Sequence, residues 1–82
     1  LLAGTTAAEK VAGFLLDAAD RSERDIIDLP MKRQDIADYL GLTIETVCRT
    51  LTAFQADGFV EFFGARRFRI RRGQAFMHLA AA

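Results

Sequence analysis

The fold of this chain is decided by residues 33–58, which read RQDIADYLGLTIETVCRTLTAFQADG. Apolar residues recur at helical spacing on both sides of a central glycine, which predicts one helix over 33–40 and a second over about 44–57. Gly41 suits the end of the first helix, and Thr43 is a favoured residue for capping the start of the second. Two helices joined by three residues that include a glycine indicate a helix-turn-helix unit.

The flanking segments complete a small domain. Thr6 and Glu9 have the spacing of a capping box at the start of a helix, and Pro30 places the short β-like run before it at the edge of a sheet. We expect a helix at about 6–20, a short strand at about 26–29, the helix-turn-helix at about 33–57, a wing hairpin at about 59–72, and an apolar-leaning tail at 73–82 that can form a terminal helical turn. This order predicts a mostly α fold with a small β-hairpin, a winged helix-turn-helix.

Length and composition limit the class of protein. The 82 residues are enough for one domain, and 51% hydrophobic with 27% charged residues is typical of a folded chain. No apolar run approaches the roughly 18–20 residues that cross a bilayer, and no signal-peptide pattern is visible in these residues. Because the chain does not begin with Met, we expect it to be a piece of a longer protein.

Nothing in the sequence favours an enzyme or a metalloprotein. There is no Ser/His/Asp set, no paired carboxylates and no glycine-rich phosphate loop. Cys48 and His78 are too few ligands for a zinc site, so we expect no metal and no other cofactor. A single cysteine also fits a reducing compartment, which predicts a cytoplasmic protein. His78 is expected to be a surface residue, and the seven phenylalanines to be core residues.

A net charge of zero hides an asymmetry along the chain. Residues 1–42 hold five basic and eight acidic residues, whereas 43–82 hold six arginines and three acidic residues. Five of those arginines lie within 64–73. Such a cluster suggests a local anionic partner, but a charge run taken alone favours the alternative, a solvated strand face. Among these side chains, Arg66 and Arg67 at the wing tip are the ones we expect to contact phosphate.

The second helix of the unit has two different faces. Val47, Leu51 and Phe54 share one face and are expected to pack inward. Glu45, Arg49 and Thr52 lie on the opposite face, with Cys48 on its flank. A helix of this kind suits the major groove of DNA, where Arg can bond O6 and N7 of guanine and Glu can accept from N4 of cytosine. Thr43 and Thr46, near the positive end of the helix dipole, suit phosphate oxygens.

Residues 33–51 resemble the DNA-binding domain of Crp/Fnr-type bacterial transcription regulators. They are most similar to the FixK-like and Fnr-like branch, whose pattern is D-I-A-x-Y-L-G-L-T-x-E-T-V-S-R. The resemblance covers nearly the whole chain, including the first-helix run from Glu9 to Leu16 and the glycine-turned wing. It implies that Ile44 favours a TTGAT-like over a TGTGA-like half-site.

The resemblance and the helix geometry together give a set of candidate contacts. Base reading is assigned to Glu45, Cys48 and Arg49, and contacts with the DNA backbone to Arg33, Gln34, Thr43, Thr46, Thr52, Arg66 and Arg67. The alternative for Glu45 and Arg49 is a surface ion pair across one helical turn. Lys32 stands where the family usually has a Ser or Thr cap, so we expect a looser start to that helix.

Cys48 replaces the usual serine of the Fnr-like branch. One hypothesis is that it is a tolerated filler. The other is that it is a redox-sensitive position, since oxidation to a sulfinic or sulfonic acid places a negative charge against DNA phosphates.

We therefore expect sequence-specific binding of double-stranded DNA, as the DNA-reading domain of a bacterial transcription regulator, an activator or a repressor. The resemblance implies an inverted-repeat site, a homodimer in the full-length protein, RNA polymerase as a further partner, and no membrane. The sensor and dimerisation regions of the family lie outside this chain. The alternative is a winged helix used as a protein-interaction module.

Overall fold

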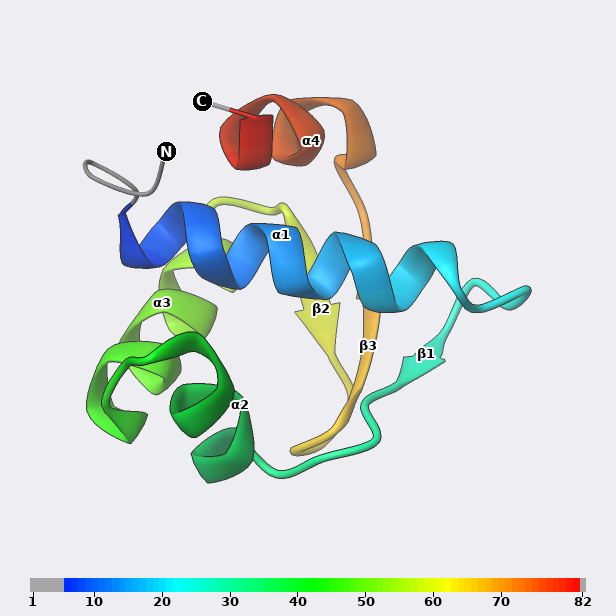
Figure 1. Ribbon diagram of the computed structural model, residues 1–82. Coiled ribbons are helices and arrows are strands. Elements are labelled where there is room, and N and C mark those ends of the chain that lie inside the picture. Colours follow the sequence, from blue (N-terminus) through cyan, green and yellow to red (C-terminus); the bar gives the residue numbers. More distant parts are fainter. Residues whose placement is uncertain (1–5, 82) are drawn as a thin grey trace.

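Four helices and three short strands make up the domain (Figure 1). The computed structural model describes residues 6–81. Its elements are α1 (Ala7–Asp20), β1 (Ile27–Asp28), α2 (Arg33–Leu40), α3 (Ile44–Ala56), β2 (Val60–Phe62), β3 (Arg67–Ile70) and α4 (Gly73–Ala81). The predicted fold class, mostly α with a β-hairpin, is confirmed.

The strands form one antiparallel sheet in the order β1-β3-β2. The wing hairpin supplies β2 and β3, with Phe62 opposite Phe68, and β1 adds a third strand, with Ile27 opposite the other side of Phe68. Strand β1 lies at the edge, which suits the proline that soon follows it. It is shorter than the predicted 26–29 because Ile26 is 40% exposed and makes no ladder pair.

The core lies between α1, α3 and the sheet. In Figure 1, α1 crosses the molecule in front of β2 and β3, with α2 and α3 below it and α4 above it. Leu15 of α1, Leu51 of α3 and Phe68 of β3 are all at most 1% exposed. The helical and strand periodicities therefore meet in one apolar cluster, which holds the helix-turn-helix against the sheet.

The tail predicted at 73–82 is instead the helix α4 of 9 residues, which is longer than the terminal turn that the sequence suggested. Phe76 is fully buried, with its ring centroid 5.0 Å from that of Phe54 and 5.7 Å from that of Phe59. Leu79 and Ala80, three and four residues later, also pack against the core. This i, i+3, i+4 set gives the segment an apolar face, and packing of that face on α1 stabilises a helix too short to persist alone.

The expectation that all seven phenylalanines are core residues was also wrong. Phe63 follows β2 at the start of the wing turn and is 42% exposed. The guanidinium carbon of Arg69 lies 5.6 Å from its ring centroid, so the exposed ring is covered by a cation instead of by apolar groups.

Candidate nucleic-acid interface

The turn between α2 and α3 is fixed by its backbone. Gly41 has φ 72°, in the left-handed region that favours glycine, and ends α2. The N–H of Leu42 donates to the carbonyl of Ala37 at 2.8 Å, which satisfies one of the last carbonyls of α2. Thr43 then caps α3 by accepting from the N–H of Thr46 at 3.2 Å. These local bonds set the two helices at a defined angle.

Helix α3 has one buried and one exposed face, as its sequence pattern predicts. Val47, Leu51 and Phe54 are at most 3% exposed, whereas Glu45 and Arg49 are exposed. Within residues 6–81 neither of these two makes an ion pair or a side-chain hydrogen bond, so the predicted alternative of a surface pair across one turn is not formed. The exposed face therefore offers the Glu45 carboxylate, which can accept hydrogen bonds, and the Arg49 guanidinium, which can donate them, and neither has a partner within the described residues.

The threonine hydroxyls along α3 differ in whether their proton is already donated to another group of the domain. The Thr43 hydroxyl donates to that of Thr46 at 2.9 Å, and the Thr52 hydroxyl donates back to the carbonyl of Cys48 at 2.9 Å. Since phosphate oxygens only accept, both hydroxyls must rotate away from these partners to contact one. Thr46 accepts the bond from Thr43 and keeps its own proton.

Cys48 lies at the flank of the exposed face. Its thiol is free and the residue is partly buried. Arg49, the next residue, and Thr52, one helical turn later, are both exposed. The Cys48 side chain therefore lies at the border between the packed and the exposed face of α3.

The start of α2 carries two of the predicted backbone contacts. Gln34 is exposed, and its side-chain amide donates to Asp38 Oδ1 at 3.0 Å. Arg33 is partly buried, with its guanidinium carbon 5.2 Å from the ring centroid of Phe62 in the wing. Lys32 is the N-cap and makes no side-chain cap bond, so this helix start lacks the reinforcement that Thr43 gives α3.

The wing tip holds Arg66 and Arg67, whose surroundings differ. Arg66 is exposed and has no ion-pair partner among the described residues. Arg67 donates from Nε to Asp28 Oδ1 at 2.9 Å. This hydrogen bond and the charge of Asp28 raise the pKa of Arg67 above its usual range. The sequence did not signal this pairing, because it depends on β1 joining the wing.

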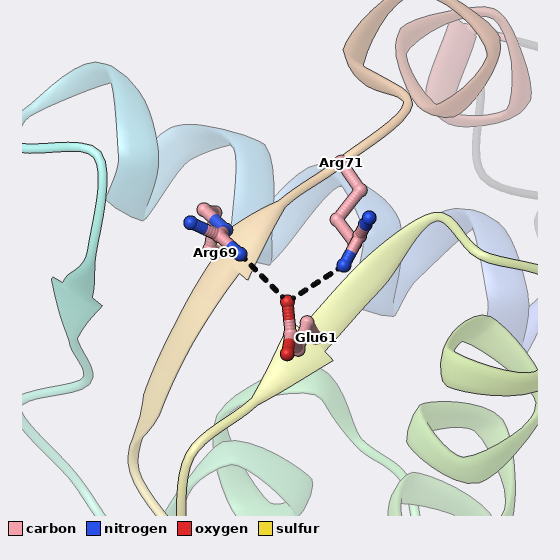
Figure 2. A network of polar contacts seen from close by, with 3 residues as sticks. All are labelled: Glu61, Arg69 and Arg71. Carbon is pink, nitrogen blue, oxygen red and sulfur yellow. Dashed lines mark hydrogen bonds and ion pairs between the residues drawn. The ribbon is translucent and has the colours of Figure 1, made fainter.

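Arg69 and Arg71 of the wing also have an acidic partner within the domain, the single carboxylate of Glu61 (Figure 2). Glu61 Oε1 accepts from Arg69 at 2.8 Å and from Arg71 at 2.9 Å. The hydrogen bond from Arg69, helped by that from Arg71, lowers the pKa of Glu61 below its ordinary value of 4.5. The sequence left two interpretations of this charge run, an anionic partner or a solvated face. The structure adds a third, an internal network.

Other kinds of site find no support in the part of the chain that the structure describes. Residues 6–81 contain no group of three or more His, Cys, Asp or Glu side chains placed to hold a metal ion. Each helix in this range is too short or too polar to cross a membrane.

Sequence comparison gives one family and several close relatives. Residues 9–79 match the model of the Crp-like helix-turn-helix domain. The nitrogen fixation regulation protein FixK of Azorhizobium caulinodans is 46% identical over 85 aligned residues, covering 96% of this chain and 34% of the relative. FixK of Bradyrhizobium diazoefficiens is 54% identical over 63 residues, covering 71% of this chain and 27% of the relative. The chain thus spans about a third of the length of these curated relatives.

Solved structures show the same arrangement. FixK2 from Bradyrhizobium japonicum superposes with a TM-score of 0.88 at 46% identity, covering 94% of this chain and 39% of that one. The CO-dependent transcription factor CooA from Carboxydothermus hydrogenoformans gives a TM-score of 0.81 at 25% identity, covering 96% and 38%.

Proposed function

The chain belongs to the Crp-like helix-turn-helix family, as a DNA-binding domain of Crp/Fnr-type transcription regulators, and we propose that its α3 reads a TTGAT-like half-site in the major groove. Arg49 donates as a fork to a guanine, and Glu45 accepts from a base at the neighbouring step. Cys48 lies against the edge of the same bases. The domain is a binding module and not an enzyme.

One observation carries the base-reading proposal. The exposed face of α3 holds Glu45 and Arg49 with no partner among residues 6–81, although they stand one helical turn apart. Their donors and acceptors are therefore free for base edges at no cost in broken internal bonds. The opposite face of α3 is fully buried, so the helix is held rigidly while it reads.

The DNA backbone is contacted from both sides of α3. Arg33 and Gln34 at the start of α2, Thr46 on α3 and Arg66 in the wing turn keep donors that are free or easily released. Thr43 and Thr52 each have their one hydroxyl donor engaged in the free domain, so each contacts phosphate only after exchanging an internal bond. Arg67 keeps its terminal N–H donors, but its charge is offset by Asp28, which accepts from its Nε. We expect these three to contribute less.

The whole protein is proposed to act as a homodimer on an inverted repeat. Half-sites about one helical turn (roughly 34 Å) apart present the same groove face to two copies of α3. Several relatives are named transcriptional activators, including FnrL of Cereibacter sphaeroides, which supports the role of an activator. Contact with RNA polymerase, in the cytoplasm at the bacterial nucleoid, is a further part of this proposal. The domain alone should bind weakly, because it loses the effective concentration that a linked partner provides.

Redox modulation at Cys48 is the second part of the proposal. Two equivalents of hydrogen peroxide convert the thiol to a sulfinic acid, each giving up one oxygen and leaving as water. The new negative charge at the border of the reading face repels the DNA backbone. After peroxide treatment the wild type should lose affinity while its melting temperature holds, and Cys48→Ser should keep both. Equal loss in the two proteins would remove Cys48 from this role.

The half-site is tested by fluorescence anisotropy with three labelled duplexes at one salt concentration. They carry a TTGAT inverted repeat, a TGTGA inverted repeat, and a scrambled sequence of the same composition. We expect the TTGAT duplex to bind most tightly. Equal affinity for all three would overturn sequence reading, and absence of binding to any duplex would favour a protein-interaction module.

A further inference from the structure

We propose that Phe62 is a positioning residue for DNA binding, whose ring holds the Arg33 guanidinium ready for a phosphate. This inference rests on the proposed function, because it gives Arg33 a phosphate partner. It assigns a role in recognition to an apolar wing residue that does not itself contact DNA.

The contact is a cation over an aromatic face. The guanidinium carbon of Arg33 lies 5.2 Å from the ring centroid of Phe62, within the range of a favourable cation–π contact. The Phe62 ring is in turn stacked on Phe68, with centroids 5.5 Å apart and planes 25° apart. Phe68 is fully buried at the centre of the sheet. The arginine is therefore the outer member of a stack that is anchored in the core.

The guanidinium nitrogens of Arg33 make no hydrogen bond within the described residues. Its Nε is buried without a hydrogen-bond partner, the one such side-chain atom among residues 6–81. The two terminal nitrogens also lack a partner in this range but are not buried, so they face solvent. A guanidinium with a desolvated inner edge, an aromatic ring against it and free outer donors is arranged to accept an anion at those outer donors.

The stack also joins the wing to the helix-turn-helix. Arg33 opens α2, and Phe62 ends β2. The segment that leads into α2 is held beside the wing turn, where the N–H of Leu29 donates to the carbonyl of Arg66 at 2.8 Å. Figure 1 shows this segment and the turn at the same end of the molecule. Because Arg33 is held against the wing, the proposed phosphate-binding groups at the start of α2 and in the wing turn keep a fixed position relative to each other.

The benefit of the stack is preorganisation. A free arginine loses much rotamer freedom when it binds a phosphate, and a ring that already orders the side chain reduces that loss. Without the ring, the charge of Arg33 remains but its position is lost. We therefore expect Phe62→Leu, which keeps an apolar side chain at the strand end, to weaken DNA binding by about three- to tenfold.

The stack is first tested without DNA, by NMR of the arginine Nε–Hε groups. In the wild type, the Hε of Arg33 should be shifted upfield by the ring and should exchange slowly with water, whereas that of exposed Arg66 should do neither. Phe62→Tyr should retain the shift, and Phe62→Leu should lose it. An Arg33 signal that matches Arg66 in the wild type would overturn the inference, even if Phe62→Leu failed to fold.

The role in binding is tested by a double-mutant cycle on the TTGAT duplex with Arg33→Gln and Phe62→Leu. Arg33→Gln should lower the slope of log K against log salt by about 0.9, the value for one phosphate contact. In that background Phe62→Leu should cause little further loss, and Phe62→Tyr alone should bind like the wild type. Phe63→Leu is the matched control, since its ring contacts Arg69, and it should not couple to Arg33.

The outcomes separate the two proposals. If the wild type binds no duplex, the proposed function fails and takes this role of Phe62 with it. If the wild type binds and the Arg33 and Phe62 losses simply add, DNA binding stands and the positioning role is wrong.

Discussion

The outward face of α3 and the outward face of the wing sheet both carry exposed arginines, but only one leaves them unpaired. On α3, Arg49 has no acidic partner among residues 6–81. On the sheet, Arg69 and Arg71 share Glu61, and Arg67 binds Asp28. The difference teaches that the density of arginines in a sequence does not measure the positive charge that is available to a ligand.

Strand register explains the pairing on the sheet. Glu61 stands directly opposite Arg69, and Asp28 directly opposite Arg67, in the two antiparallel ladders. Side chains opposite each other across strands interact without any change of backbone. On α3, the acid and the base are also within reach, one turn apart, yet remain separate. The acidic and basic groups of the sheet are thus paired within the domain, whereas Glu45 and Arg49 of α3 have no partner among residues 6–81.

The largest expected effect is on stability and concerns the sheet. Phe68→Ala removes a fully buried ring from β3, the strand between β1 and β2, and should lower the free energy of unfolding by about 3–5 kcal/mol. Urea denaturation followed by circular dichroism measures it. Phe63→Ala, at the exposed wing position, is the control and should cost far less. Equal losses in the two variants would contradict the claim that the buried ring of Phe68 stabilises the fold more than the exposed ring of Phe63.

The next effect is on recognition and concerns the helix. On the proposed function, Arg49→Ala should weaken binding to the TTGAT duplex by about 1–3 kcal/mol and flatten the preference at one base pair. Its free energy of unfolding should stay within about 0.5 kcal/mol of the wild type. Competition binding against single-base variants of the half-site measures it. Arg71→Ala, on the sheet, should leave the preference unchanged, and full preference in Arg49→Ala would refute the assignment.

A smaller effect should follow from releasing the sheet arginines. Glu61→Gln keeps the side-chain size but removes the negative charge that Arg69 and Arg71 share. Affinity for any duplex should rise by about two- to fivefold at low salt, without a gain in sequence preference. Anisotropy with the scrambled duplex measures it. Glu23→Gln makes the same change of net charge at an exposed position without an ion pair among the described residues, and an equal rise there would show that location does not matter.

The smallest effect is the pH dependence of the same network. The pKa of Glu61 is lowered in the folded domain by Arg69 and Arg71, so its contribution to stability is complete above the ordinary value of 4.5 and is lost as pH falls through the lower folded value. The melting temperatures of wild type and Glu61→Gln should converge as the pH is lowered below 4.5. A difference that stays constant with pH would show that the network does not stabilise the fold.

Much of the fold could be predicted from local signals. The capping box at Thr6, the glycine between α2 and α3, and the Val47, Leu51 and Phe54 face each depend on residues a few positions apart, and the structure contains all three. The extent of helix α4 was underestimated because the segment has no capping signal. Its stability comes from burying Phe76 against residues far away in the sequence.

The candidate site was predictable to the same extent. The exposed face of α3 follows from helical periodicity, so Glu45, Cys48 and Arg49 could be placed in advance. The Arg67–Asp28 pair, the Glu61 network and the stack of Arg33 on Phe62 each join different elements. No sequence period encodes such contacts, since they depend on which strands pair and in which register.

The central claim, that the α3 face and not the sheet face contacts DNA, is tested most directly by NMR titration of the uniformly labelled domain with the TTGAT duplex. The account predicts that the largest changes in backbone amide shifts fall within residues 43–52, with further changes at the start of α2 and in the wing turn. Glu61, Arg69 and Arg71 should change little, and their side-chain bonds should persist. If the largest changes lay on that sheet face while residues 43–52 were unperturbed, the account would be contradicted.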